Sequence, residues 1–205
     1  MKSRQRPAAL PPPKRGAENA AMTTLVFMIR GINVGGNRPL KMDRLKALCA
    51  ALGLQNMRTY LQSGNVVADS PEGDPAAHGA ALEQRILRDC GYEVSVVVRT
   101  AAQMARVLSS HPSGPRAALE PKLHHATFLV RPAVPAALAG VTLPLGKGEE
   151  ATLVGDVVYL YCPNGYGDTK VNNSFFERKL GLAATTRNWQ TVTALGGLCA
   201  PLPAE

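Results

Sequence analysis

Paired cysteines, long apolar runs and abundant aromatic residues are all missing from this sequence. The four cysteines stand singly, without a CxxC pair, which favours reduced thiols in a cytoplasmic protein over a disulfide framework. No apolar run approaches the roughly eighteen residues that a membrane span needs. Aromatic residues make up only 5% of the chain, and the RNP1 pattern is absent, which disfavours a surface that stacks RNA bases.

The most recognisable catalytic and cofactor motifs are absent as well. The sequence has no HExxH, no Cys/His quartet, no GxxxxGK[ST] loop and no GxGxxG. Cys162 is a conceivable nucleophile, but a small buried hydrophobe explains it better. His124 and His125 are adjacent in a predicted strand, so their side chains point to opposite faces and do not easily share a metal. We expect no metal and no cofactor.

The net charge of +8 is spread unevenly along the chain. Residues 1–21 hold five basic residues and one acid, so half of the excess lies there, and the rest is only mildly basic. The first 21 residues are rich in proline and lack the apolar stretch of a secretory signal. We expect a disordered extension. Met22 directly precedes the first strand-like run and is a candidate for the true start.

Hydrophobic residues make up 45% of the 205 residues, enough for a substantial core in one large or two small domains. Their spacing predicts a β-α-β-β-α-β order in the first hundred residues, which is the split βαβ or ferredoxin-like pattern. Strands are expected at 24–30, 57–62, 65–68 and 93–99, and helices at 42–52, after the Asp74-Pro75 cap and after the Thr100–Gln103 capping box.

A similar order of elements follows in the second part of the chain. We infer an α+β fold of two tandem ferredoxin-like halves that arose by internal duplication; the alternative is that two common topologies coincide by chance. The predicted organisation is an extension at 1–21, halves at 22–110 and 124–205, and a linker at 111–123. Strands are expected at 125–131, 151–154, 157–162 and 183–188, and helices at 134–139, after a Ser174–Glu177 capping box and from Trp189.

A glycine-rich loop between the first predicted strand and helix is the main candidate for a binding site. Glycines and Asn33 permit unusual backbone angles, so that successive N–H groups can converge on an anion beside a helix N-terminus. The alternative is a tight connection that binds nothing. The candidate ligand-binding residues on this loop are Arg30, Asn33, Gly35, Gly36 and Lys41.

The turn after the second predicted strand is expected beside this loop. In a split βαβ unit the first two strands run in the same direction, so the connections that leave them meet at one end of the sheet. Gln62, Ser63 and Asn65 would then bring amide and hydroxyl groups to the loop. They are equally compatible with an ordinary solvated turn.

Two later segments supply further candidates. Asn164, Thr169 and Lys170 precede a predicted helix start, which is a favourable place for an anion, although Lys170 could simply be solvated. Arg187 has the planar guanidinium that suits a carboxylate or phosphate, or it could hold the last helix to a neighbouring loop. Asn188 is a candidate cap for that helix, and Trp189 is expected to pack in the core.

Four sequence blocks resemble one known family. They are RGINVGGN at 30–37, RTYLQSGNVV at 58–67, PNGYGDTK at 163–170 and TTRNWQTV at 185–192. Together they resemble the uncharacterised bacterial family called domain of unknown function 1697. The resemblance implies a duplicated α+β architecture, but no activity, cofactor or catalytic residue. Thr169 departs from the pattern, because a serine is expected before the lysine.

The sequence therefore favours a cytoplasmic protein that binds an anionic or phosphorylated small molecule through its glycine-rich loop. An enzyme that acts on such a ligand is the first alternative, although no acid–base or nucleophile set stands out. A nucleic-acid-binding module is the second alternative and is disfavoured by the low aromatic content. Neither the ligand nor the oligomeric state follows from the sequence.

Overall fold

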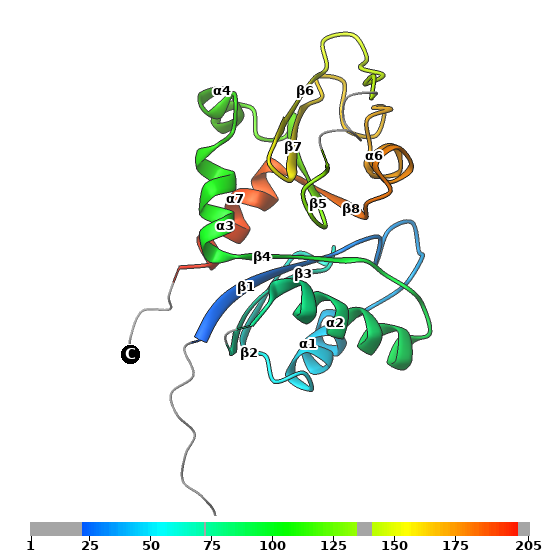
Figure 1. Ribbon diagram of the computed structural model, residues 1–205, viewed down its shortest axis with the longest axis vertical. Coiled ribbons are helices and arrows are strands. Elements are labelled where there is room, and N and C mark those ends of the chain that lie inside the picture. Colours follow the sequence, from blue (N-terminus) through cyan, green and yellow to red (C-terminus); the bar gives the residue numbers. More distant parts are fainter. Residues whose placement is uncertain (1–21, 72, 135–140, 201–205) are drawn as a thin grey trace, which may run out of the picture.

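The computed structural model describes residues 22–71, 73–134 and 141–200, which form an α+β fold with two four-stranded antiparallel sheets and six helices. One sheet lies above the other in Figure 1, and helices cover the outer face of each. The predicted extension at 1–21 lies outside the described residues. So does the predicted helix at 134–139, apart from its first residue.

The first sheet has the strand order β2-β3-β1-β4, with β1 at its centre. Residues 25–29 of β1 are all buried, as the near-continuous apolar run in the sequence predicts. The last strand begins at Val96 instead of residue 93. The strands are β1 (Met22–Ile29), β2 (Gln55–Tyr60), β3 (Asn65–Pro71) and β4 (Val96–Thr100).

The second sheet repeats this arrangement with the order β6-β7-β5-β8. The register repeats as well: Arg99 pairs with Val26 in the first sheet, and Arg187 pairs with Ala126 in the second. Each of these arginines directly precedes the N-cap of the helix that follows its strand. The strands are β5 (His124–Leu129), β6 (Glu150–Val154), β7 (Val157–Tyr161) and β8 (Ala184–Asn188).

Six helices of the described residues lie around the two sheets. The first two cover the outer face of the first sheet, α6 covers the outer face of the second, and α3 packs against α7 between them (Figure 1). A short helix, α4, lies within the predicted linker at 111–123 and buries Ala117. The helices are α1 (Met42–Ala50), α2 (Pro75–Cys90), α3 (Ala101–Ser109), α4 (Gly114–Leu119), α6 (Asn173–Leu180) and α7 (Trp189–Leu198).

The helix caps follow local sequence rules, with one correction. Asp74 accepts a hydrogen bond from the amide of Ala76, and Thr100 with Gln103 forms the predicted capping box. Asn188 caps α7 as predicted. The Ser174 capping box is wrong, because Asn172 caps α6 and its side chain accepts from the amide of Phe175.

The inner faces of the two sheets share one hydrophobic core. Val26 and Met28 of β1 belong to the same buried cluster as Ala126 and Phe128 of β5. Helices α3 and α7 complete this cluster, and Trp189, the predicted core aromatic, is 6% exposed within it. The sheets are therefore held together by apolar packing, and the site described next lies where β1 and β8 approach each other.

Candidate functional site

A cavity of about 530 Å³ opens where the chain leaving β1, the turn after β2, the N-terminus of α6 and strand β8 come together. We call it the central cleft. Its size falls in the range of small-molecule sites, roughly 300–1,000 Å³. The cleft is lined by Arg30, Gly31, Ile32, Val34, Ser63, Tyr166, Asn172, Asn173, Ser174, Thr185, Thr186, Arg187, Asn188 and Thr191.

Arg187 lines the central cleft and is the centre of a hydrogen-bond network. Its residue is only 9% exposed. A guanidinium has five N–H donors, and here all five have neutral acceptors. Nε donates to the Asn65 side chain (2.6 Å), Nη1 to Thr185 Oγ1 (2.7 Å) and the Thr186 carbonyl (2.9 Å), and Nη2 to the carbonyls of Ile29 (2.8 Å) and Ser63 (3.3 Å). Arg187 therefore joins β8 to β1 and to the 61–65 turn.

The positive charge of Arg187 is not neutralised within the described part of the chain. No carboxylate there lies within ion-pair distance, and burial lowers the pKa of its guanidinium to about 10. Arg99, its counterpart in the first sheet, differs in this respect. Its Nη2 lies 2.8 Å from the carboxylate of Asp156. All five donors of Arg187 thus have acceptors but no opposite charge beside them in the described ranges, whereas Arg99 has an opposite charge and leaves its Nε without a partner there.

Arg30 supplies the second cation of the central cleft. Its Nη2 donates to Glu177 at 2.6 Å, and both side chains are about one-quarter exposed. The Nε of Arg30 is buried and has no partner among the described residues. A buried N–H without an acceptor is unfavourable, so Arg30 keeps one unsatisfied donor at the edge of the cleft.

The N-terminus of α6 reaches the cleft with its first turn. The amide and hydroxyl of Ser174 have no acceptor in the described ranges, and the helix dipole places partial positive charge there. Nearby, the Tyr166 hydroxyl donates to Thr186 (2.9 Å), which donates to Asn173 Oδ1 (2.6 Å). Burial raises the pKa of Tyr166, whose ring stacks on His125. This network fixes the wall beside α6.

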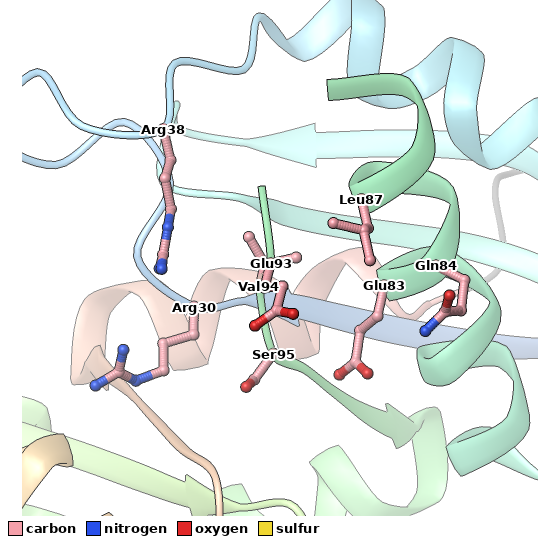
Figure 2. A pocket seen from close by; sticks show the side chains of 8 residues that line it. All are labelled: Arg30, Arg38, Glu83, Gln84, Leu87, Glu93, Val94 and Ser95. Atoms are coloured by element: carbon pink, nitrogen blue, oxygen red, sulfur yellow. The ribbon is translucent and has the colours of Figure 1, made fainter. Parts of the chain in front are cut away.

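None of the described residues that line the central cleft is an aspartate or glutamate. Other cavities differ. One of about 310 Å³, which we call the Arg99 cavity, contains Asp156. Another, of about 370 Å³, contains Glu83 and Glu93; Figure 2 shows these carboxylates and the Arg38 guanidinium around one space, with Arg30 extending away from the glutamates. The central cleft is therefore suited to a negatively charged ligand.

Four of the residues predicted from the sequence line the cleft: Arg30, Ser63, Arg187 and Asn188. The predicted adjacency of loop and turn is also observed. The Asn33 side chain donates to the carbonyls of Leu40 (2.8 Å) and Gln62 (2.7 Å) and accepts from the amide of Leu40 (2.7 Å). Asn33 therefore joins the glycine-rich loop to the turn after β2.

Asn65 has a structural position as well. It is fully buried, donates to the Tyr60 carbonyl (3.1 Å) and Ser63 Oγ (2.9 Å), and accepts from Arg187. The Gln62 carbonyl accepts from the Asn33 side chain, and Gln62 is exposed. These two residues hold the walls of the cleft and do not line it.

The glycines of the loop tip and Lys41 lie away from the cleft. Gly35 and Gly36 have the positive φ angles expected from the sequence, +57° and +77°. They form the exposed tip of a small hairpin closed by the Asn33 amide on the Arg38 carbonyl at 3.2 Å. Lys41 is the exposed N-cap residue of α1. Apart from Arg30, the loop residues that line the cleft are Gly31, Ile32 and Val34.

The 163–170 segment is likewise divided. Thr169 is buried, and its hydroxyl accepts from the amide of Val171. Lys170 lines a different cavity, of about 230 Å³, with Glu149 and Asp168. Asn164 lies in the turn closed by the Gly165 amide on the Cys162 carbonyl at 3.0 Å. Seven lining residues outside the loop were not predicted from the sequence: Tyr166, Asn172, Asn173, Ser174, Thr185, Thr186 and Thr191. Four of them, Tyr166, Thr185, Thr186 and Thr191, fall in the blocks at 163–170 and 185–192.

Other features of the described ranges also bear on function. No helix there has the length and apolar character to cross a membrane. No three His, Cys, Asp or Glu side chains of those residues converge on a metal position. Cys162 is buried, and burial raises the pKa of its thiol to about 11, as expected for a small core residue. His124 contacts His111 while His125 stacks on Tyr166, so the two histidines face opposite ways.

Comparison with known proteins yields a similar solved structure and a matching family. The fold is similar to that of the conserved bacterial protein SP0830 from Streptococcus pneumoniae, with a TM-score of 0.64 and 22% identity over 88% of this chain and 100% of that chain. No curated protein matches the sequence. A family model described as protein of unknown function (DUF1697) matches residues 22–159, so the blocks at 163–170 and 185–192 lie beyond it. Because the match covers more than half of the sequence, the chain belongs to the DUF1697 family.

Proposed function

We propose that the protein binds a small anionic ligand, one that carries a phosphate or carboxylate group, in the central cleft. The observation that carries this proposal is Arg187. It is a buried arginine with five neutral hydrogen-bond acceptors and no carboxylate nearby in the described ranges, at the edge of a cavity whose described lining is free of acidic residues.

The size of the electrostatic attraction between Arg187 and an anion supports the proposal. An anionic group about 5 Å from the Arg187 guanidinium, at an effective dielectric constant near 20, gains about 3 kcal/mol. That corresponds to an affinity increase of roughly 100-fold or more. Because all the N–H groups of Arg187 are in use, this arginine contributes its field, and other groups make direct contacts.

Three groups are placed to make these contacts. The Arg30 side chain lines the cleft and is about one-quarter exposed, and Ser174 offers its amide and hydroxyl at the start of α6. Ser63 adds a hydroxyl from the turn after β2. Ile32 and Val34 give the cleft an apolar side, which suits the carbon skeleton of a ligand such as a sugar phosphate or a mononucleotide.

We further propose that residues 22–110 and 124–205 are ferredoxin-like halves related by duplication, in a cytoplasmic protein. Three observations support the duplication. The two sheets have matching strand orders, and Arg99 and Arg187 have matching register. One helix directly follows the last strand of each sheet. The four cysteines are free thiols, which is compatible with a reducing compartment.

The test compares two variants with the same change in charge. Arg30→Gln removes a cleft cation and leaves Glu177 without its partner, whereas Lys41→Gln removes an exposed cation outside the cleft. Ligand binding is measured by calorimetry and thermal shift with inorganic phosphate, ribose 5-phosphate and AMP, and with adenosine as the uncharged control.

We expect the phosphorylated probes, and not adenosine, to bind the unmodified protein. R30Q should weaken that binding at least tenfold, and K41Q should leave it within about twofold, because an exposed lysine is screened by solvent. Equal losses in both variants would show that binding follows general surface charge. Absence of binding by all three anions would contradict the proposal.

A further inference from the structure

The two buried arginines make reciprocal contacts between the sheets. Arg99 Nη2 donates to the carbonyl of Leu129 at the end of β5 (2.6 Å), and Arg187 Nη2 donates to the carbonyl of Ile29 at the end of β1 (2.8 Å). The two acceptors occupy the same place in the register, because Ile29 pairs with the first residue of β4 and Leu129 with the first residue of β8. Each sheet therefore sends one arginine to the other.

Each arginine also lines a cavity. Arg187 lines the central cleft, and Arg99 lines the Arg99 cavity of about 310 Å³. The Arg99 cavity contains further groups able to bind an anion: the side chains of Gln103, Arg106 and Ser110 from α3 and its end. Arg99 itself is only 3% exposed, and its Nε is buried without a partner in the described part of the chain. Two cavities with a buried arginine thus occupy corresponding places in the fold.

One difference between the two places concerns the charge beside the arginine. The amide of Leu129 donates to the carbonyl of Asp156, and the amide of Ile29 donates to the carbonyl of Gly64, so these two acceptors correspond. The Asp156 carboxylate lies 2.8 Å from Arg99 Nη2. Gly64 has no side chain, and a Cβ there would lie 2.8 Å from Ile32 Cδ1, so an acidic residue has no room at that position.

We infer that Asp156 serves as an internal counter-ion that occupies the anion position of the Arg99 cavity and thereby confines anion binding to the central cleft. Anion binding in the central cleft rests on the proposed function, whereas the neutralisation of Arg99 by Asp156 does not depend on it. The charge of Arg99 is neutralised from within the chain, whereas that of Arg187 is left for a ligand. Asp156 is thus a residue that determines which of two similar cavities binds.

Removing this carboxylate should create a second anion site. Asp156→Asn keeps the size and a hydrogen-bond acceptor for Arg99 but removes the negative charge. Arg99 then resembles Arg187, a buried cation beside a cavity without an acidic residue among its described lining. Phosphate entering this cavity would find Arg99, Arg106 and Gln103, and charge-assisted hydrogen bonds to such groups are the strong ones.

The experiment is a titration of ¹⁵N-labelled full chain with inorganic phosphate, followed by amide shifts in two regions. Residues 172–174 report on the central cleft, and residues 99–106 report on the Arg99 cavity. We expect the unmodified protein to respond only at 172–174. D156N should respond in both regions and bind phosphate in the Arg99 cavity at least tenfold more tightly than the unmodified protein does.

The control is Asp168→Asn, which makes the same chemical change beside a different cavity and should leave 99–106 unresponsive. If D156N does not fold, Asp156→Ser is titrated in its place. A folded variant that responds only at 172–174 overturns the inference and leaves the proposed function standing. A response only at 99–106 in the variant supports the inference while contradicting the proposed function. A response at 99–106 in the unmodified protein also overturns the inference.

Discussion

Acidification should destabilise this protein through histidines that are buried in the neutral form. His111 and His125 are 9% and 6% exposed, and burial lowers the pKa of each to about 4. His111 lies against the rings of His124, Tyr159 and Trp189, and its Nε2 has no partner in the described residues. A positive charge there would be neither solvated nor paired.

The direction and size of the effect follow from linkage. In the unfolded chain these histidines titrate near pH 6.5, so between pH 6.5 and 4 the unfolded state binds more protons and stability falls as the pH falls. At pH 5 each histidine should lower the free energy of unfolding by about 2 kcal/mol relative to neutral pH, which is about 4 kcal/mol for His111 and His125 together. Their destabilising effect is absent above pH 7.5.

Urea denaturation at pH 7.5 and pH 5 measures this difference. The double variant His111→Asn and His125→Phe keeps the acceptor for Ser113 and the stacking on Tyr166 but cannot take up the protons. The double variant should lose most of the stability difference between the two pH values, whereas His78→Gln, at a half-buried position of α2, should keep it. If the double variant weakens between the two pH values as much as the unmodified protein does, these buried histidines are not the cause.

Two further outcomes test the local structure. Gly64→Ala should lower the free energy of unfolding by about 1–3 kcal/mol, because φ is +78° and the new Cβ would lie 2.8 Å from Ile32 Cδ1; an unchanged urea midpoint would refute this reading of the turn. Thr100→Ala should cost about 1 kcal/mol in the same assay, since the capping box of α3 is lost, and Thr59→Ala, on β2, serves as a comparison.

Local patterns were sufficient to predict most of the fold. Apolar runs, helical spacing and turn residues placed the strands and helices of both sheets, and caps such as Asp74 and Thr100 set helix starts. The error at α6 has a local cause. Asn172 and Ser174 are both good capping residues two positions apart, and the apparent box with Glu177 favoured the wrong one. In the structure Glu177 bonds Arg30, so it is unavailable for a capping box.

The site was only partly predictable, because it depends on how two sheets meet. The strand directions correctly placed the 62–65 turn beside the loop, as the Asn33 contact to Gln62 shows. The contact of Arg187 with the Ser63 carbonyl joins residues 124 positions apart, and no periodicity encodes it. Gly35 and Gly36 have the unusual backbone angles that the sequence predicts. They lie at the exposed tip of the hairpin and not in the cleft.

Stability alone gives a poor account of Arg187. Replacing a buried charge network by apolar residues of similar volume is often neutral or stabilising, so a structural joint between β1 and β8 does not require a cation. At Arg99 the desolvation of the guanidinium is offset by Asp156. At Arg187 neutral acceptors satisfy all five N–H donors. They do not neutralise the positive charge, which lies at the wall of the central cleft. A charge kept in that position is explained if a ligand, and not the chain, supplies its partner.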